Sequence, residues 1–171
     1  MSSPSHNPGY SALRKGRLDV KEALYFLTIT IQRPLLRNSV GLTQSDLLAS
    51  LINRAQSINE WELLSMVVMP DHLHALTRLK ADKIAIPVRK LKGGFLPVLR
   101  NQGIKWQPGF YDHRLRPEDN VGGVLRYMWL NPYRAGLSRE GDPWSGWYCS
   151  EAAAQWMGSG DIDSPPPEWW Q

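Results

Sequence analysis

Two histidines stand two residues apart in the motif MPDHLHAL. If the motif forms a strand, His72 and His74 project from one face while Leu73 points to the other. The pair would then offer two imidazole nitrogens to one metal ion. No thiol lies nearby, which excludes a tetrahedral sulfur site, and imidazoles joined by an amide or carboxylate oxygen would suit Mg²⁺ or Mn²⁺. Because a third ligand must come from elsewhere, the pair alone is equally compatible with a structural role.

Tyr127 and Asn131 lie four residues apart in the segment YMWLNPYRAGL. On a helix this spacing places both side chains on one face. If that face packs over the strand that carries the histidines, Asn131 could complete a metal shell and Tyr127 could approach a bound phosphate. Taken alone, the pair is explained more simply as part of an amphipathic helix whose tyrosine packs against the core.

Two further residues stand close to these motifs in the sequence. Asp71 could orient a metal-bound imidazole by a hydrogen bond to the ring nitrogen that does not bind the metal, although Pro-Asp is equally typical of a turn. His113, in FYDHRLR, could lie near the site, but we favour packing beside Tyr111 and Trp106 or a contact with DNA.

Positive charge is concentrated in the middle of the chain. The net charge is +4, but residues 78–116 hold ten Lys or Arg against two Asp, an excess of +8 that leaves −4 elsewhere. This distribution indicates a phosphate-facing surface, with a merely solvated surface as the alternative. Aromatic residues there could stack on unpaired bases, although core packing is their commoner use. The candidate DNA-binding residues are Arg78, Lys80, Arg89, Lys90, Lys92, Lys105, Trp106, His113, Arg114, Arg116 and Arg134.

The hydrophobic pattern predicts the elements that must position these residues. Apolar and β-branched runs predict strands at 24–32, 62–69 and 72–79, the last two as a hairpin broken by Pro70. Helical spacing predicts a helix over 47–58, with Thr43 or Ser45 as its cap. A basic helix over 82–101 is expected to be interrupted at its two glycines. Another helix should begin at 117–119 and end near Asn131, before Pro132.

These elements predict an α+β fold, an antiparallel sheet with packed helices, rather than a doubly wound sheet. We expect one domain over residues 21–157, between an N-terminal arm at 1–20 and a Pro-rich tail at 158–171. The single cysteine, Cys149, excludes an internal disulfide. No apolar run could span a membrane and the first residues lack a signal-peptide pattern, so a cytoplasmic protein is expected.

Three motifs, MPDHLHAL, KWQPGFYDHRLR and YMWLNPYRAGL, occur in the order and spacing of a known family. They resemble the tyrosine transposases of the insertion-sequence-200 type, within the HUH endonuclease superfamily, and most closely the subgroup associated with repetitive extragenic palindromes (REP). The resemblance spans residues 25–144. It implies a ferredoxin-like fold, with Tyr127 as nucleophile and His72, His74 and Asn131 as ligands of Mg²⁺ or Mn²⁺.

The reaction that this resemblance implies is transesterification on single-stranded hairpin DNA. Binding to DNA would associate the protein with the nucleoid. The tyrosine would form a 5′-phosphotyrosine and release a 3′-hydroxyl, with no water consumed. The base that accepts the phenol proton, the target sequence and the choice between monomer and homodimer cannot be inferred from the sequence.

The chain departs from the family pattern at Gly122, Gly123 and Trp129. Each glycine lowers helix propensity by about 1 kcal/mol relative to alanine, so the helix that carries Tyr127 could be loosened. Three alternatives remain at this point: a catalytically inactive nucleic-acid-binding module, a metal-dependent phosphodiesterase that uses water, and a structural domain with a coincidental histidine pair.

Overall fold

The computed structural model describes residues 18–32, 44–101, 103, 105–139 and 141–158. Most of the expected arm and tail, and the expected helix cap Thr43, lie outside these residues. In the described part, no helix has the length and apolar character needed to cross a membrane.

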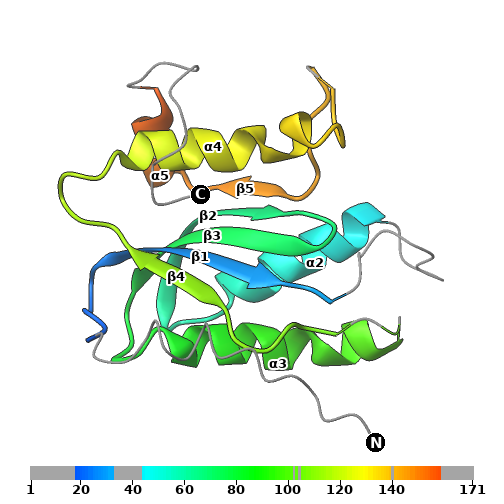
Figure 1. Ribbon diagram of the computed structural model, residues 1–171, viewed down its shortest axis with the longest axis horizontal. Coiled ribbons are helices and arrows are strands. Elements are labelled where there is room, and N and C mark those ends of the chain that lie inside the picture. The colour runs from blue at the N-terminus through cyan, green and yellow to red at the C-terminus, as the bar shows by residue number, and fades with distance from the viewer. Residues whose placement is uncertain (1–17, 33–43, 102, 104, 140, 159–171) are drawn as a thin grey trace, which may run out of the picture.

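A five-stranded antiparallel sheet forms the centre of the molecule, with strand order β4-β1-β3-β2-β5 (Figure 1). This confirms the expected α+β class. The three long strands follow the predicted β-branched and apolar runs within one or two residues. The strands are β1 (Leu24–Thr30), β2 (Trp61–Val68), β3 (His72–Leu79), β4 (Tyr111–Arg114) and β5 (Trp147–Cys149).

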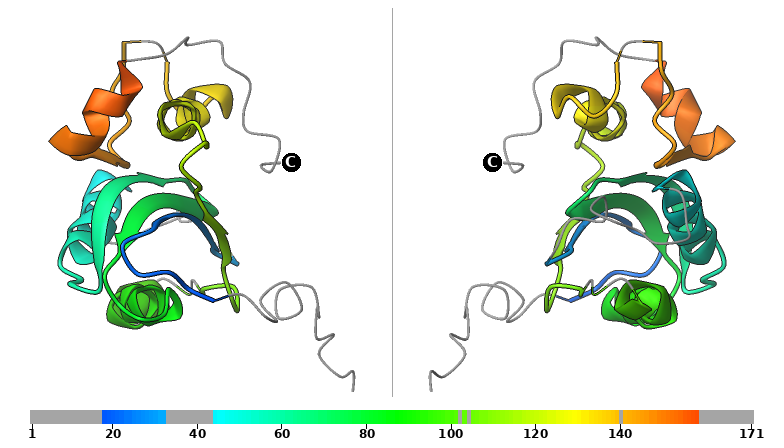
Figure 2. Two further views of the ribbon diagram at one scale, coloured as in Figure 1. Left: turned by 90° about the vertical axis from the view of Figure 1, so that its left-hand side faces the viewer. Right: turned by 90° about the vertical axis from the view of Figure 1, so that its right-hand side faces the viewer.

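Helices cover both faces of the sheet, so that the central strands are buried on both sides (Figure 2). On one face, α2 (Gln44–Gln56) and α3 (Ala85–Asn101) pack against side chains such as Leu27, Ile29 and Leu73. On the other face, α4 (Val121–Arg134) packs against Phe26 and Leu76, beside α5 (Glu151–Met157). Apolar residues repeat about every 3.6 residues in the helices and every 2 in the strands, and these repeats place them in two apolar layers, one on each face of the sheet.

Helix α3 is continuous, which corrects the expected interruption at Gly93 and Gly94. Gly93 is exposed with open space around it, whereas a Cβ at Gly94 would collide with the guanidinium group of Arg54. Arg54 also reaches the carbonyl of Lys90, at 3.4 Å. The buried stripe that α3 presents to the sheet therefore outweighs the weak propensity of two glycines.

Both ends of α4 differ from the prediction. The helix begins at Val121, because the Asn120 side chain accepts a hydrogen bond from the Gly123 N–H at 2.9 Å and caps it. It does not end near Asn131 but runs past Pro132 to Arg134. Proline in the last turn removes only one helical hydrogen bond, and the buried Pro132 ring is held by packing instead.

Gly122 allows α4 to touch α5. A Cβ at this position would lie less than 3.0 Å from the backbone oxygen of Trp156, closer than real Cβ atoms come. Arg126, one turn further on, is buried and donates to the Met157 carbonyl at 3.3 Å. Gly122 is therefore a close contact between helices rather than a weak point of α4, which corrects the sequence-based expectation.

Candidate active site

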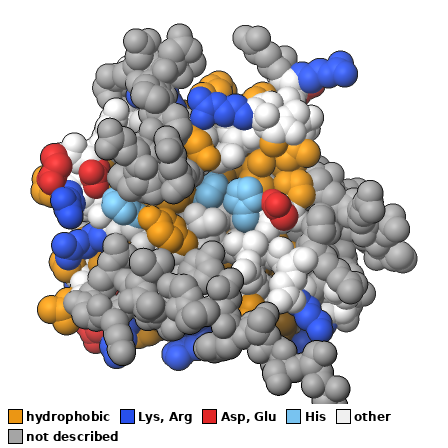
Figure 3. Space-filling model, viewed as in Figure 1, with side chains coloured by type: hydrophobic (Ala, Val, Ile, Leu, Met, Phe, Trp, Pro, Cys, Tyr) orange, Lys and Arg blue, Asp and Glu red, His pale blue; other side chains and the backbone are white. Residues whose placement is uncertain are grey.

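Strand β3 places His72 and His74 on the sheet face that α4 covers, while Leu73 packs into the opposite layer. The two imidazole centroids are 4.6 Å apart and the rings meet edge to face. His74 is 5% exposed, and His72 is partly exposed. On the face seen in Figure 3, histidine side chains reach the surface beside apolar and acidic ones. The expected shared face of the pair is therefore present.

Each imidazole is held through its Nδ1 atom. His72 Nδ1 lies 2.6 Å from an Asp71 carboxylate oxygen, and His74 Nδ1 lies 2.9 Å from the Thr28 hydroxyl. The nitrogen that each ring can offer to a ligand is then Nε2. The sequence pointed to Asp71 but not to Thr28. Thr28 lies opposite His74 only through the register of β1 against β3, which the sequence does not state.

Burial fixes the charge state of His74. Loss of hydration, and after it the neighbouring His72, lower its pKa from 6.5 to about 3, although the hydrogen bond with the Leu27 carbonyl acts in the opposite sense. The ring is therefore neutral at physiological pH. Neutral imidazole is the form that can bind a metal ion.

Helix α4 brings the tyrosine to the histidines. The ring centroid of Tyr127 is 6.3 Å from that of His74, and the rings meet edge to face. The guanidinium carbon of Arg134 is 5.6 Å from the Tyr127 ring centroid, a cation–π distance. Tyr127 thus lies between a histidine of the sheet and a cation of its own helix.

Asn131 follows Tyr127 by one turn of α4. The nitrogen of its side-chain amide is buried and has no hydrogen-bond partner among the described residues. Amide nitrogen and oxygen are assigned from such partners, so either atom can occupy this position. This amide is therefore available to bind a ligand.

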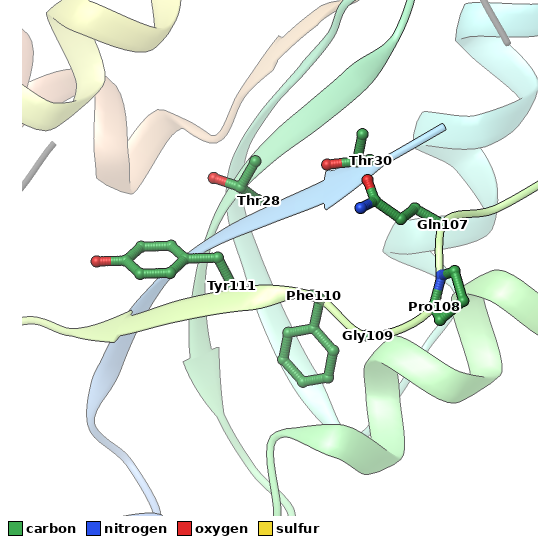
Figure 4. A pocket seen from close by; sticks show the side chains of 7 residues that line it. All are labelled: Thr28, Thr30, Gln107, Pro108, Gly109, Phe110 and Tyr111. Carbon is green, nitrogen blue, oxygen red and sulfur yellow. The ribbon is translucent and has the colours of Figure 1, made fainter. Parts of the chain in front are cut away.

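Figure 4 shows a small open slot whose lining includes Thr28, the residue that contacts His74. It lies between β1 and the segment that leads into β4. The register places two of its residues, Thr28 and Thr30, opposite His74 and His72. The slot is lined by Thr28, Thr30, Gln107, Pro108, Gly109, Phe110 and Tyr111.

Lys92 holds the outer wall of this slot in place. Its ammonium donates to the Gln107 carbonyl at 2.8 Å and also to the Gly109 carbonyl. In return, the Trp106 indole donates to the Lys92 carbonyl at 3.0 Å. Both residues were predicted to contact DNA, and the structure shows them joining α3 to the loop before β4.

The other predicted DNA-binding residues lie on several surfaces. Arg134 is at Tyr127, whereas Arg89 and Lys90 are on α3, on the opposite side of the sheet from the histidines. His113 is on β4, with Nε2 3.6 Å from an Asp119 oxygen. Lys105 and Arg114 are exposed. Ion pairs join Arg78 to Glu62, Lys80 to Glu22, Lys90 to Glu60 and Arg116 to Glu118.

Similar proteins were found in sequence and in structure, although no family model matches the chain. The REP-associated tyrosine transposase of Escherichia coli K12 is 25% identical over 130 residues, 75% of this chain and 77% of the relative. A Haemophilus influenzae protein whose name assigns it to the same group is 29% identical over 139 residues, 68% of this chain and 73% of that protein.

A solved structure shares the fold. It is a REP-associated tyrosine transposase bound to a REP hairpin, with a TM-score of 0.62 and 22% identity, covering 88% of this chain and 90% of that one. The resemblance inferred from the three motifs is thus confirmed: the chain is similar in sequence to two proteins named as REP-associated tyrosine transposases and shares its fold with a third.

Proposed function

We propose that the protein is a tyrosine transposase that cleaves and rejoins one DNA strand beside a hairpin, with Tyr127 as the nucleophile. The observation that carries this proposal is the position of Tyr127. Its ring centroid lies 6.3 Å from that of His74, which is buried and neutral and has the partly exposed His72 beside it. Two relatives named as tyrosine transposases, and a fold shared with a transposase bound to a hairpin, support the same reaction.

In the proposed reaction the Tyr127 phenol oxygen attacks a backbone phosphorus. A P–O bond forms to the tyrosine, and the bond from phosphorus to the 3′ oxygen breaks, which leaves a 5′-phosphotyrosine and a 3′-hydroxyl. The phenol proton leaves during the attack, and the departing oxygen takes up a proton. Because the phosphodiester energy is retained in the covalent bond, a second 3′-hydroxyl can reseal the strand.

The residues present fit a divalent metal ion. Among the described residues, His72 and His74 are not part of a cluster of three His, Cys, Asp or Glu side chains, and we propose a ligand of another type as the third. The amide of Asn131 is of that type, and its buried atom has no hydrogen-bond partner in the part of the chain that the structure describes. His72 and His74 would supply Nε2 and Asn131 its amide oxygen. When bound, Mg²⁺ or Mn²⁺ would polarise the scissile phosphate and stabilise charge on its oxygens.

The protein's own side chains set the geometry around the phosphate. Asp71 orients His72 through Nδ1 at 2.6 Å, as carboxylates commonly do behind metal-binding histidines. Arg134, over the Tyr127 ring, carries a fixed positive charge next to the nucleophile, where it can contact a phosphate oxygen. The slot beside the histidines would receive part of the unpaired strand.

The test is a denaturing gel that detects a covalent protein–DNA adduct. Labelled single-stranded hairpin oligonucleotides would be incubated with the protein in Mn²⁺ or in chelator. The adduct should form only with metal and should be lost in Tyr127→Phe and His72→Ala. Tyr133→Phe is the matched control, because Tyr133 lies on the same helix but its hydroxyl donates to the Asp142 carbonyl, so this variant should form the adduct.

Two other outcomes would reject the proposed nucleophile. Metal-dependent cleavage without an adduct would assign the reaction to water and the protein to the phosphodiesterases. Hairpin binding without cleavage, unchanged in Tyr127→Phe, would leave a DNA-binding module that retains only the fold.

A further inference from the structure

Thr28 occupies the middle of the sheet face that carries the candidate site. Its cross-strand neighbours are His74 on β3 and Tyr111 on β4. Figure 4 shows the Thr28 and Thr30 side chains rising from the same side of β1. Thr28 therefore belongs both to the wall of the slot and to the surroundings of a proposed metal ligand.

We propose that Thr28 is a positioning residue that holds the His74 ring by a hydrogen bond at Nδ1 and so presents Nε2 to the site. This inference rests on the proposed function, in which Nε2 of His74 binds the metal ion. Neutral imidazole carries one N–H, and the nitrogen that keeps the proton cannot act as a ligand. The Thr28 hydroxyl lies 2.9 Å from Nδ1. In the proposed arrangement Nδ1 carries the proton and donates it to this hydroxyl, which leaves the lone pair on Nε2.

The surroundings of His74 make this contact important. The ring is 5% exposed, so water cannot readily replace a lost partner at Nδ1. Threonine is β-branched and sits in a paired strand, which restricts its rotation and keeps the hydroxyl in place. Without the hydroxyl the ring would depend on its hydrogen bond with the Leu27 carbonyl, and it could turn about its Cβ–Cγ bond and exchange the two nitrogens.

Thr28 differs from the residue that holds the other histidine. His72 is held by the Asp71 carboxylate, whose side chain is 65% exposed at the start of β3. A carboxylate in the place of Thr28 would set a negative charge inside the slot, where it would repel a DNA phosphate. A hydroxyl can orient the buried ring without adding charge.

Three variants test the proposal. Thr28→Val keeps the shape but removes the hydroxyl, and Thr28→Ser keeps the hydroxyl. Thr30→Val is the matched control, because Thr30 lies two residues along the same strand, lines the same slot and faces His72.

The first measurement is the tautomer of His74 in metal-free protein, from the imidazole nitrogen chemical shifts in NMR spectra. Wild type, Thr28→Ser and Thr30→Val should show the form protonated at Nδ1, whereas Thr28→Val should show a mixture of the two forms. The second measurement is Mn²⁺ affinity by electron paramagnetic resonance. It should fall about tenfold or more in Thr28→Val, the range found for such supporting contacts, and should be recovered in Thr28→Ser.

Two results would overturn the proposal. One is a wild-type His74 protonated at Nε2. The other is a Thr28→Val protein with the tautomer and Mn²⁺ affinity of Thr30→Val, which would mean that the Leu27 carbonyl alone holds the ring. Failure of the proposed function would look different: the tautomer would respond to Thr28→Val although wild type bound no Mn²⁺, because the NMR measurement requires neither metal nor DNA.

Discussion

Replacing Gly122 by alanine should separate α5 from α4, the helix that carries Tyr127. The new methyl group would lie less than 3.0 Å from the Trp156 backbone oxygen, whereas ordinary contacts begin near 3.4 Å. A backbone oxygen cannot rotate away as a side chain can, so the helices must move apart by several tenths of an ångström. Such overpacking costs about 1–3 kcal/mol of the free energy of unfolding.

Gly93→Ala provides the matched control. Gly93 is also in a helix, and its added methyl group would meet nothing within 4 Å. Alanine there should stabilise the protein by about 1 kcal/mol through helix propensity alone. Gly122 is the second residue of its helix and gains no more than that, so the two variants should differ in stability by at least about 1–3 kcal/mol.

Urea unfolding followed by tryptophan fluorescence measures this difference, since the chain contains eight tryptophans and Trp156 lies at the contact. The slope of the free energy against urea should be equal in the two variants, because the surface exposed on unfolding is unchanged. If Gly122→Ala proved as stable as Gly93→Ala, the close contact between α4 and α5 would not exist in solution.

Three further predictions concern the site. Because the pKa of His74 is lowered to about 3 in the folded chain, the unfolded chain binds the extra proton at higher pH than the folded chain does. The free energy of unfolding of metal-free protein should therefore fall as the pH drops from about 6.5 to 5, by up to about 1.4 kcal/mol per pH unit. Urea titrations at several pH values measure this slope, and His74→Gln should remove it. Asp71→Asn should lower Mn²⁺ affinity about 10–100-fold, measured by calorimetry, since His72 loses its carboxylate partner; an unchanged affinity would exclude that role. Lys92→Met should weaken hairpin binding without changing its salt dependence, because the Lys92 ammonium binds backbone carbonyls. Lys105→Met removes an exposed cation and should lower the slope of log affinity against log salt concentration by about 0.7. Equal slopes in the two variants would contradict this assignment.

The long strands and the shared face of the two histidines could be predicted from the sequence, because alternation and β-branched runs are local properties. The short elements could not. Strand β4 has four residues and pairs with β1, and β5 has three residues and pairs with β2. Runs this short have no local hydrophobic pattern that predicts a strand.

The sequence does not reveal the contact of Thr28 with His74, for a similar reason. Its role depends on the register between β1 and β3, which only the assembled sheet defines. The ends of α4 differ from the prediction because the Asn120 cap and the packing of Pro132 outweigh the local preferences of the proline and acidic residues. Local propensity was overruled at each of these positions by contacts between elements.

The candidate nucleophile and the candidate ligand histidines are carried by different layers of the protein. Tyr127 belongs to a helix, and His74 to the sheet beneath it, so their separation is set by the apolar side chains between the layers, among them Val124 and Met128. Evolution could therefore silence or retune the enzyme by changing the size of a buried residue while every residue of the site stays intact. Inspecting motifs alone would misclassify such a descendant as active.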